Sequence, residues 1–422
     1  MFRPKPIAQP GFPASLWRDG NFLRLWAAQA VSSFGRLITR DGLPLAAVLT
    51  IHAGPQELGV LGALAAGPSF IVGLFAGSYV DRSRRRSILI AADIFRAGVL
   101  MIVPIAAWLN LLSIMELFIA AALVGAASAL FDIADKAYLP TLIERRQLVE
   151  GNSKLSTTDA LAEIGGPAIA GILFQLLTAP IAIAVNAATY LVSAAFLGTI
   201  DKSESAVAGP LSAPHWWEDF KFGAQAVFGD AILRPLLLMA MTAAFFGAFF
   251  LALYTFFAIT ELGLTPAMLG VTVATGGVGA LLGAVIALRA SQRFGIGPII
   301  LVASFGFGAA QTVFPFAGGS PAFAMAILMA AQLIGDSLFV VASVSGLSLR
   351  QAILPVDVLG RAGAVFHAGS GAVAVLGALA GGILGAAIGA PSTLLIAALG
   401  MAAAPLWAVA SPLWRLRTIP AD

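Results

Sequence analysis

Residues 77–86, GSYVDRSRRR, lie where two long apolar stretches of the chain meet, one ending near residue 80 and the next beginning near residue 88. Five of these ten residues are charged. A helix that spans the hydrocarbon core of a bilayer needs about 20 mostly apolar residues, and both neighbouring stretches reach that length. The ten residues therefore mark a loop at which the chain leaves a membrane and turns back into it.

The apolar stretches on either side of this loop belong to a series that fills almost the whole chain. Hydrophobic residues make up 59% of the 422 residues and charged residues only 11%, whereas soluble domains have about 25% charged residues. We therefore expect an all-α integral membrane protein and not an enzyme. Twelve spanning helices are predicted, near residues 22–51, 57–80, 88–109, 112–136, 154–178, 180–200, 234–261, 266–289, 297–317, 321–346, 361–388 and 391–412.

Several kinds of functional site are excluded by residues that the sequence lacks. The chain has no cysteine, which excludes a disulfide framework and thiolate metal sites, and its three histidines are scattered. The phosphate-binding pattern Gly-x-x-x-x-Gly-Lys-Ser/Thr is absent, and no His/Glu cluster suggests a membrane protease. We therefore expect no cofactor and no metal.

The basic residues predict the orientation in the membrane, because Lys and Arg are retained on the cytosolic side of short loops. None falls in the six loops on the side opposite the N-terminus. Both terminal tails, residues 1–21 and 413–422, are therefore predicted to be cytosolic, and topology rather than nucleic-acid binding explains the net charge of +3. The basic residues on the N-terminal side are 82, 84, 85, 86, 145, 146, 154, 202, 221, 289, 293, 350, 361, 415 and 417.

The two halves of the chain repeat each other. Leu58-Gly59-Val60 recurs as Leu269-Gly270-Val271 (269 − 58 = 211), and Gly166 matches Gly381 at a shift of 215. The repeat predicts two pseudo-symmetric six-helix bundles, residues 22–200 and 234–412, with a binding site between them near the midplane. The connection, residues 201–233, is expected to be cytosolic and to contain an amphipathic helix over 216–230, although a plain linker is the alternative.

The loop motif at residues 77–86 resembles the signature of the major facilitator superfamily, Gly-x-x-x-Asp-Arg-x-Gly-Arg-Arg, except that Arg84 replaces the second glycine. The resemblance covers nearly the whole chain and implies the major facilitator fold. It implies a monomeric transporter of a small-molecule substrate in a prokaryotic inner membrane, working by alternating access. The segments that resemble the branch of enterobactin exporters and macrolide efflux pumps are 139–140, 166–171, 220–223 and 233–235.

The resemblance also implies a gating role for the loop motif, Gly77, Asp81, Arg82, Arg85 and Arg86. Asp81 is expected to latch the second helix to the eleventh in one access state, and a carboxylate at a helix end can also accept hydrogen bonds from free backbone N–H groups. Asp132 and Asp135 in the fourth helix are the expected acidic partners of Arg85 or Arg86. Alternatively, these arginines are topology signals and the aspartates are solvated.

Gly165-Gly166-Pro167, with Gly171 one turn further on, resembles the antiporter motif and so favours exchange or export. Small residues let two helices approach closely, and proline breaks the local hydrogen-bond ladder. A small-residue packing face is the alternative interpretation of the same four residues.

Charged residues at membrane depth are the strongest indication of a functional site, since placing each one at a helix centre costs about 2.5–3.5 kcal/mol on insertion scales. Arg36, Glu163 and Asp336 all fall near the midplane at 1.5 Å per residue. Arg40 lies one turn from Arg36 beside Asp41, so a cluster of net positive charge is expected, which would suit an anionic substrate. A buried pair of Arg36 with Asp336 or Glu163 that holds the halves together is the alternative.

Glu163 and Asp336 are the candidates for proton coupling, although either could be a permanently paired structural carboxylate. Asp93 and Arg96, three residues apart, are expected to neutralise each other. We expect a proton-coupled exporter of drug-like or siderophore-like molecules. An importer or facilitator of a nutrient or organic anion is the first rival, because fold alone does not decide direction, and a lipid-handling or signalling protein is the second.

Overall fold

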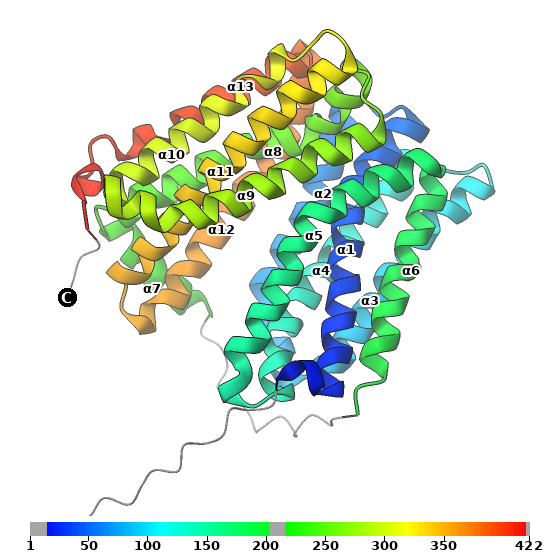
Figure 1. The fold of residues 1–422 in the computed structure, drawn as a ribbon, viewed down its shortest axis with the longest axis horizontal. Coiled ribbons are helices and arrows are strands. Elements are labelled where there is room, and N and C mark those ends of the chain that lie inside the picture. The colour runs from blue at the N-terminus through cyan, green and yellow to red at the C-terminus, as the bar shows by residue number, and fades with distance from the viewer. Residues whose placement is uncertain (1–14, 202–215, 419–422) are drawn as a thin grey trace, which may run out of the picture.

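The computed structural model describes residues 15–201 and 216–418, and in this part of the chain it is all-helical, without a β-strand. The predicted fold class is confirmed: twelve long helices form two bundles (Figure 1). The N-terminal bundle contains α1 (Gly20–Ala46), α2 (Pro55–Arg82), α3 (Arg85–Trp108), α4 (Ile114–Leu142), α5 (Leu148–Leu176) and α6 (Ala179–Gly198). The C-terminal bundle contains α8 (Leu233–Phe256), α9 (Pro266–Phe294), α10 (Ile296–Gln311), α11 (Pro321–Ile353), α12 (Val356–Ile388) and α13 (Ala390–Ala403).

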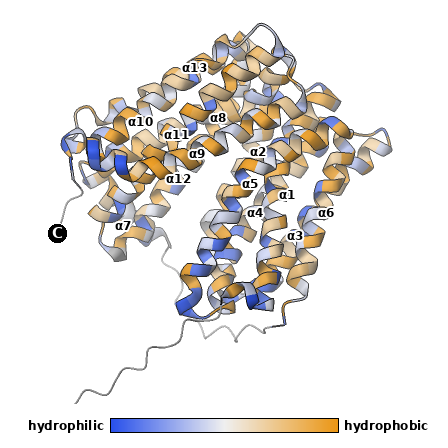
Figure 2. Ribbon diagram, viewed as in Figure 1, coloured by the Kyte–Doolittle hydropathy of each residue, from blue (hydrophilic) through white to orange (hydrophobic). Residues whose placement is uncertain are grey.

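Several helices extend further than their predicted spans. The predicted tenth span ended at residue 346, but α11 runs to Ile353, and the predicted fifth span began at residue 154, but α5 begins at Leu148. The predicted spans followed the apolar residues alone, whereas a helix continues beyond the hydrocarbon core wherever its backbone hydrogen bonds persist. The extra turns carry hydrophilic residues, which Figure 2 shows at the helix ends.

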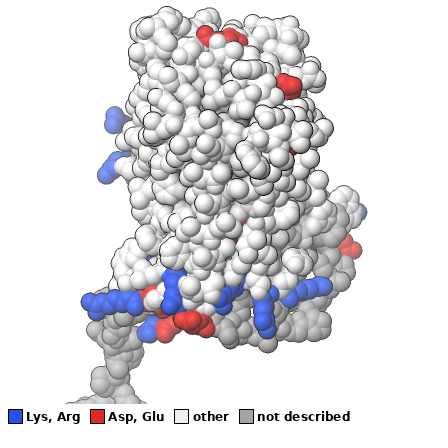
Figure 3. Space-filling view, turned by 90° about the vertical axis from the view of Figure 1, so that its right-hand side faces the viewer, with Lys and Arg blue, Asp and Glu red and all other residues white. Residues whose placement is uncertain are grey.

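Basic side chains gather at one end of the long helices. On the face shown in Figure 3, most Lys and Arg side chains lie toward the lower end, a few more project from the left edge in the upper half, and the charged side chains at the top are carboxylates. We call the end where α2 stops and α3 starts, at Arg82 and Arg85, the basic end, and the other the opposite end. At the opposite end, Glu57 and Glu116 lie in the first turns of α2 and α4. The side chain of each accepts a hydrogen bond from the backbone N–H of the residue just before its helix.

The two bundles repeat the same packing. In the N-terminal bundle α1 packs on α5 and α6, α2 on α4, and α3 on α4 and α6. In the C-terminal bundle α8 packs on α12 and α13, α9 on α11, and α10 on α11 and α13. Equivalent helices even start alike, since Pro55 of α2 and Pro266 of α9 are 211 residues apart (266 − 55 = 211). This correspondence confirms the predicted pseudo-symmetry.

Two symmetry-related glycine pairs join the bundles near the opposite end. Helix α2 packs along α12, and α5 packs along α9. A Cβ atom on Gly59 would stand 2.6 Å from Cα of Gly382, and one on Gly171 would stand 3.0 Å from Cα of Gly270. Both partners are shifted by 211 residues (270 − 59 and 382 − 171), and the same shift places Gly166 on Gly377 rather than on Gly381. Toward the basic end the bundles diverge (Figure 1).

A further helix, α7 (Trp216–Gly229), lies against the basic end of the C-terminal bundle. Asp219 forms an ion pair with Arg361 of α12 at 2.8 Å, and Phe220 and Ala224 pack against the core. Trp217 remains half exposed. The amphipathic position of this helix in a cytosolic interface and the bundle boundaries at 22–200 and 234–412 stay predictions. Most of the expected tail over 1–21 and residues 202–215 of the connection lie outside the described residues.

The glycine pairs predict a sharp difference between two glycine-to-isoleucine substitutions. Gly171→Ile places a branched side chain against the backbone of α9, and overpacking of this kind costs about 1–3 kcal/mol. Gly98→Ile in α3 is the matched control, because an added Cβ there meets no atom within 4 Å. We expect thermal unfolding of the purified protein in detergent to show a lower melting temperature for Gly171→Ile only. Equal melting temperatures for the two variants would show that the close contact at Gly171 is not needed to hold the bundles together.

Candidate functional site

Two adjoining cavities lie between and within the bundles. The first, of about 300 Å³, is lined from both bundles, by Arg40 and Asp41 of α1, Pro167 of α5, and residues of α8, α9, α10 and α11. The second, of about 610 Å³, lies within the C-terminal bundle among α8, α10, α11, α12 and α13. The residues that line both cavities are Gly247, Leu251, Phe307 and Met401. We call the combined space the chamber.

A network of four charged side chains on α1 and α5 lies on the N-terminal side of the chamber. Glu163 is 3.1 Å from the Arg40 guanidinium and 4.0 Å from that of Arg36. Arg40 also contacts Asp41, at 3.1 Å. One-turn spacing brings Arg36 and Arg40 to the same face of α1, as the sequence predicts. Each of the four side chains keeps between 23% and 44% of its surface exposed, so the network borders the chamber and is not sealed in dry packing.

The expected net positive charge of this cluster is wrong. Two guanidinium groups face two carboxylates, since Glu163 of α5 joins Asp41, and the network is formally neutral. The prediction counted only the charged residues of α1, because spacing along one helix does not show which side chains of another helix lie beside it. The alternative in which Arg36 pairs with Glu163 is present in the structure, but the pair joins α1 to α5 within one bundle and does not bridge the halves.

A third cavity, of about 220 Å³, lies within the N-terminal bundle and is lined mainly by polar side chains. Asp132 and Asp135 of α4 and Asp159 of α5 all face it. The hydroxyl of Ser33 donates to Asp159 at 2.6 Å, and the amide of Gln29 donates to Asp135. The expected pairing of these aspartates with Arg85 or Arg86 stays a prediction.

Asp159 was missed by the sequence analysis. It lies one turn before Glu163 on α5, so both carboxylates project toward α1. The spacing of four residues was visible in the sequence. Asp159 lies about one turn nearer the basic end than the predicted midplane. For this reason it was not among the charged residues expected to be costly in the membrane.

Asp336 is separate from the charged network. Its side chain is partly buried against Gly276 of α9, and among the described residues no hydrogen bond or ion pair satisfies its carboxylate. Gln332, one turn earlier on α11, lines the chamber. The structure therefore brings Arg36, Arg40, Asp41 and Glu163 together but leaves Asp336 alone in the other bundle.

Asp93 and Arg96 of α3 form the expected ion pair, and both are fully buried. The Arg96 guanidinium lies between the rings of Phe131 and Tyr190, 4.3 Å from each ring centroid. Ser32 also accepts a hydrogen bond from Arg96. Buried charges need paired and hydrogen-bonded partners, so this cluster ties α1, α3, α4 and α6 together as a structural element.

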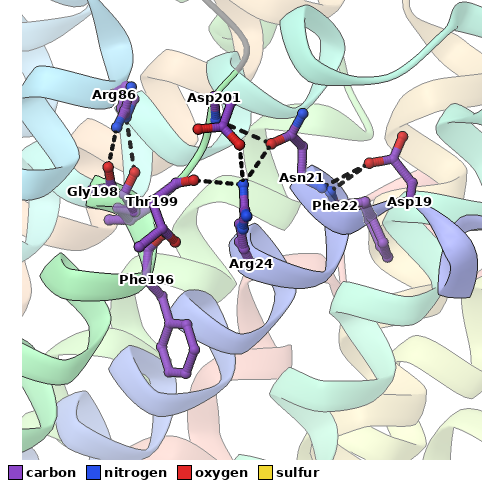
Figure 4. Close-up of polar contacts among 10 residues, drawn as sticks. Asp19, Asn21, Phe22, Arg24, Arg86, Phe196, Gly198, Thr199 and Asp201 are labelled. Carbon is purple, nitrogen blue, oxygen red and sulfur yellow. Dashed lines mark hydrogen bonds and ion pairs between the residues drawn. The ribbon is translucent and has the colours of Figure 1, made fainter.

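The loop motif is positioned by backbone contacts at the basic end. Arg86 donates hydrogen bonds to the carbonyls of Leu197 and Gly198, at 2.8 and 2.5 Å, and so caps the C-terminus of α6 (Figure 4). A guanidinium there also complements the helix dipole. Arg84 has φ −71°, an ordinary conformation, so this turn does not require the glycine that the superfamily signature has.

The remaining motif residues are placed as follows. An added Cβ on Gly77 would meet nothing within 4 Å, and Arg82 is exposed. Arg85 starts α3, and its Nε is buried. The side chain of Asp81, and with it the expected latch to α12, lies outside the described residues.

The antiporter-like residues form close helix contacts. An added Cβ would stand 3.0 Å from the ring of Phe34 at Gly165 and 2.7 Å from Leu37 at Gly166, so both glycines let α5 approach α1. The carbonyl of Pro167 and the backbone of Gly171 both lie against Gly270 of α9. This geometry corresponds to the packing interpretation of the motif, and its link to antiport stays a prediction.

No group of three or more His, Asp or Glu side chains among the described residues is arranged to hold a metal ion. The polar cavity shows why: its three aspartates share the space with Arg36, Arg96 and Lys136. Cations compete there with any bound metal.

Two matched bundles around a chamber define the chain as a membrane transporter of the major facilitator type, which is not an enzyme class. Residues 13–420 match the MFS_3 family, described as transmembrane secretion effector, and the chain belongs to this family. It is 26% identical, over 390 residues, to the uncharacterized MFS-type transporter YfiS of Bacillus subtilis (strain 168), covering 89% of each chain.

Solved structures share the fold at low identity. The nucleoside transporter NupG has a TM-score of 0.75 at 13% identity, over 92% of this chain and 97% of that one. A bacterial homologue of the iron transporter ferroportin has a TM-score of 0.71 in its inward-facing state, at 19% identity over 94% of this chain and 100% of that one. Its outward-facing structure has a TM-score of only 0.57, at 17% identity over 92% and 99%.

The charged network predicts coupled effects of two substitutions. Glu163→Gln leaves two guanidinium groups facing one carboxylate, and we expect it to lower the free energy of unfolding by about 1 kcal/mol, given the partial exposure of the groups. Arg40→Gln in the same chain should restore part of the loss. Glu144→Gln is the control, since its pair with Arg146 is exposed. Thermal unfolding of Glu163→Gln, Arg40→Gln, the double variant and the control measures the coupling, and purely additive losses would contradict the network.

Proposed function

We propose that this transporter is a proton-coupled exporter of drug-like or siderophore-like small molecules, working by alternating access in an inner membrane with both termini cytosolic. The observation that carries the proposal is the chamber. One of its walls, from the C-terminal bundle, is mainly apolar and aromatic, and the other carries the paired Arg40 and Asp41. A site of this kind accepts a bulky, mainly apolar molecule.

The alternating-access part of the proposal rests on the position of the contacts between the bundles. The glycine pairs close the opposite end, while the bundles separate toward the basic end. If basic loops face the cytosol, the chamber is accessible from the cytosol in this conformation. The greater likeness to an inward-facing than to an outward-facing neighbour supports the same assignment. A cargo that leaves the cell enters a transporter from this side.

The substrate part of the proposal rests on the lining of the chamber. Phe250, Phe307, Phe314 and Met401 line its C-terminal side, and aromatic and Met side chains adapt to apolar ligands of different shape. The neutral charged network removes the main reason to expect an organic anion. Import of a metal ion, the cargo named for the ferroportin neighbour, finds no support in the described residues, which hold no metal-ligand cluster.

The direction of transport is tested in membrane vesicles of known orientation. Everted vesicles containing the protein should accumulate a neutral, apolar fluorescent dye when the vesicle interior is made acidic, and should lose the dye when an ionophore collapses the gradient. Vesicles without the protein are the control. Uptake in right-side-out vesicles alone would establish the importer instead, and no gradient-driven movement in either orientation would end the export proposal.

The proton-coupling part of the proposal rests on Asp336. An unpaired carboxylate at membrane depth is the group whose charge costs most, whereas Glu163 is held by two guanidinium groups. We propose that Asp336 is the primary coupling residue. We also expect one copy of the chain to be the transporting unit, because the chamber is formed within one chain.

Asp336→Asn should uncouple transport from the proton gradient. We expect at least a tenfold loss of gradient-driven accumulation in everted vesicles, with passive counterflow of substrate retained, since asparagine keeps the size but not the titration of the carboxyl. Glu218→Gln on exposed α7 is the control. An Asp336→Asn protein that kept its full response to the gradient would remove Asp336 from the mechanism.

A further inference from the structure

We propose that the first cavity of the chamber recognises a planar heteroaromatic molecule whose edge carries an N–H donor next to a ring acceptor. This inference deepens the proposed function, because the ligand would be the transported substrate. It arises from three uncharged polar side chains, Tyr254 of α8, Gln311 of α10 and Gln332 of α11.

The three side chains share a condition that is rare in folded proteins. The hydroxyl of Tyr254 and the Oε1 atoms of Gln311 and Gln332 are buried, and none has a hydrogen-bond partner among the described residues. Gln311 is 7% exposed as a residue. Buried polar groups are normally paired. All three residues line the same cavity of about 300 Å³, so small rotations of these side chains would present their polar atoms to a ligand there.

Aromatic rings make up much of the same cavity wall. The ring of Phe314 lies 5.4 Å from that of Phe250 and 5.5 Å from that of Tyr254, centroid to centroid, and Phe307 also lines the cavity. Aromatic faces favour offset or edge contacts with another aromatic ring. The walls therefore suit a flat ring system, whereas the unpaired amides call for polar atoms around its edge.

The chemistry of the amides narrows the ligand further. A glutamine amide has an acceptor and a donor side by side, and so forms two parallel hydrogen bonds with an amino group next to a ring nitrogen. Arg40 and Asp41 at the cavity edge are paired with each other, so the site offers no unmatched charge for a strongly ionic ligand. A neutral amino-substituted heteroaromatic ring satisfies both conditions.

Space for one of these amides comes from a glycine. A Cβ atom on Gly335 of α11 would stand 3.3 Å from Nε2 of Gln311. The missing side chain lets Gln311 of α10 lie directly against α11, which also carries Gln332. Gln332 instead lies on the side of α11 that meets α9, where its Cβ is 3.9 Å from the position of an added Cβ on Gly276.

Binding to the purified full-length protein in detergent tests the inference. The probes, all methylated on N9, are adenine and fluorescent 2-aminopurine, measured by calorimetry and by quenching, and N6,N6-dimethyladenine, the matched probe that has no N–H donor. We expect both primary probes to bind and the dimethyl compound to bind at least tenfold more weakly. A site built for hydrogen bonds rejects an analogue that lacks them. Absence of binding by both primary probes, or equal binding of the dimethyl compound, would overturn the inference.

Substitutions separate recognition from structural support. Gln311→Leu and Gln332→Leu should each weaken adenine binding at least tenfold, yet leave the melting temperature of the unliganded protein equal or higher, because each removes an unpaired buried polar group. Gln351→Leu, exposed on α11, is the control and should change neither. Loss of both binding and stability would assign the glutamines a structural role, and unchanged binding would remove them from the site.

These binding measurements do not depend on a proton gradient or on direction. Binding without transport in everted vesicles would therefore end the exporter proposal and keep this site. Transport of the apolar dye without binding of either primary probe would keep the exporter and end this site.

Discussion

The close approach of two pairs of helices through glycine is the constraint on which the arrangement of this transporter depends. Hydrophobic burial does not drive helices together in lipid, so packing through small residues is what joins them. Gly59 with Gly382, and Gly171 with Gly270, bring the backbones of the two bundles into contact near one end. Because each pair is the symmetry copy of the other, the chain forms this closure twice from one repeated pattern.

Closure at one end determines where charge is tolerated. Arg36, Arg40, Asp41 and Glu163 lie in a helix pair that borders the chamber, and all four keep partial contact with solvent. By contrast, Asp93 and Arg96 are sealed and are held between two aromatic rings. Ion pairs thus occur in two settings within one bundle. The pairs beside the chamber stay partly exposed, whereas the sealed pair holds helices together.

The sequence was sufficient for the fold, since apolar length, the basic loops and the 211-residue repeat each predicted it independently. It also brought Arg36 and Arg40 to one face, because helical spacing is local. It did not give the neutrality of the cluster, which needs α5 beside α1, or the isolation of Asp336. The unpaired glutamines were missed for a physical reason: a search for costly charges ignores neutral amides, whose lack of partners becomes visible only when the helices are packed.

The two bundles contribute different chemistry to the chamber. The N-terminal bundle supplies the paired Arg40 and Asp41 of the charged network, and the C-terminal bundle supplies aromatic rings and unpaired amides. A ligand held mainly by the C-terminal bundle would move with it when the bundles rock, and would pass the charged wall without exchanging partners there. Asp336 lies in that same bundle, one turn from Gln332. If Asp336 is the coupling residue, as we propose, a change in its protonation acts on the same bundle that carries the proposed ligand site.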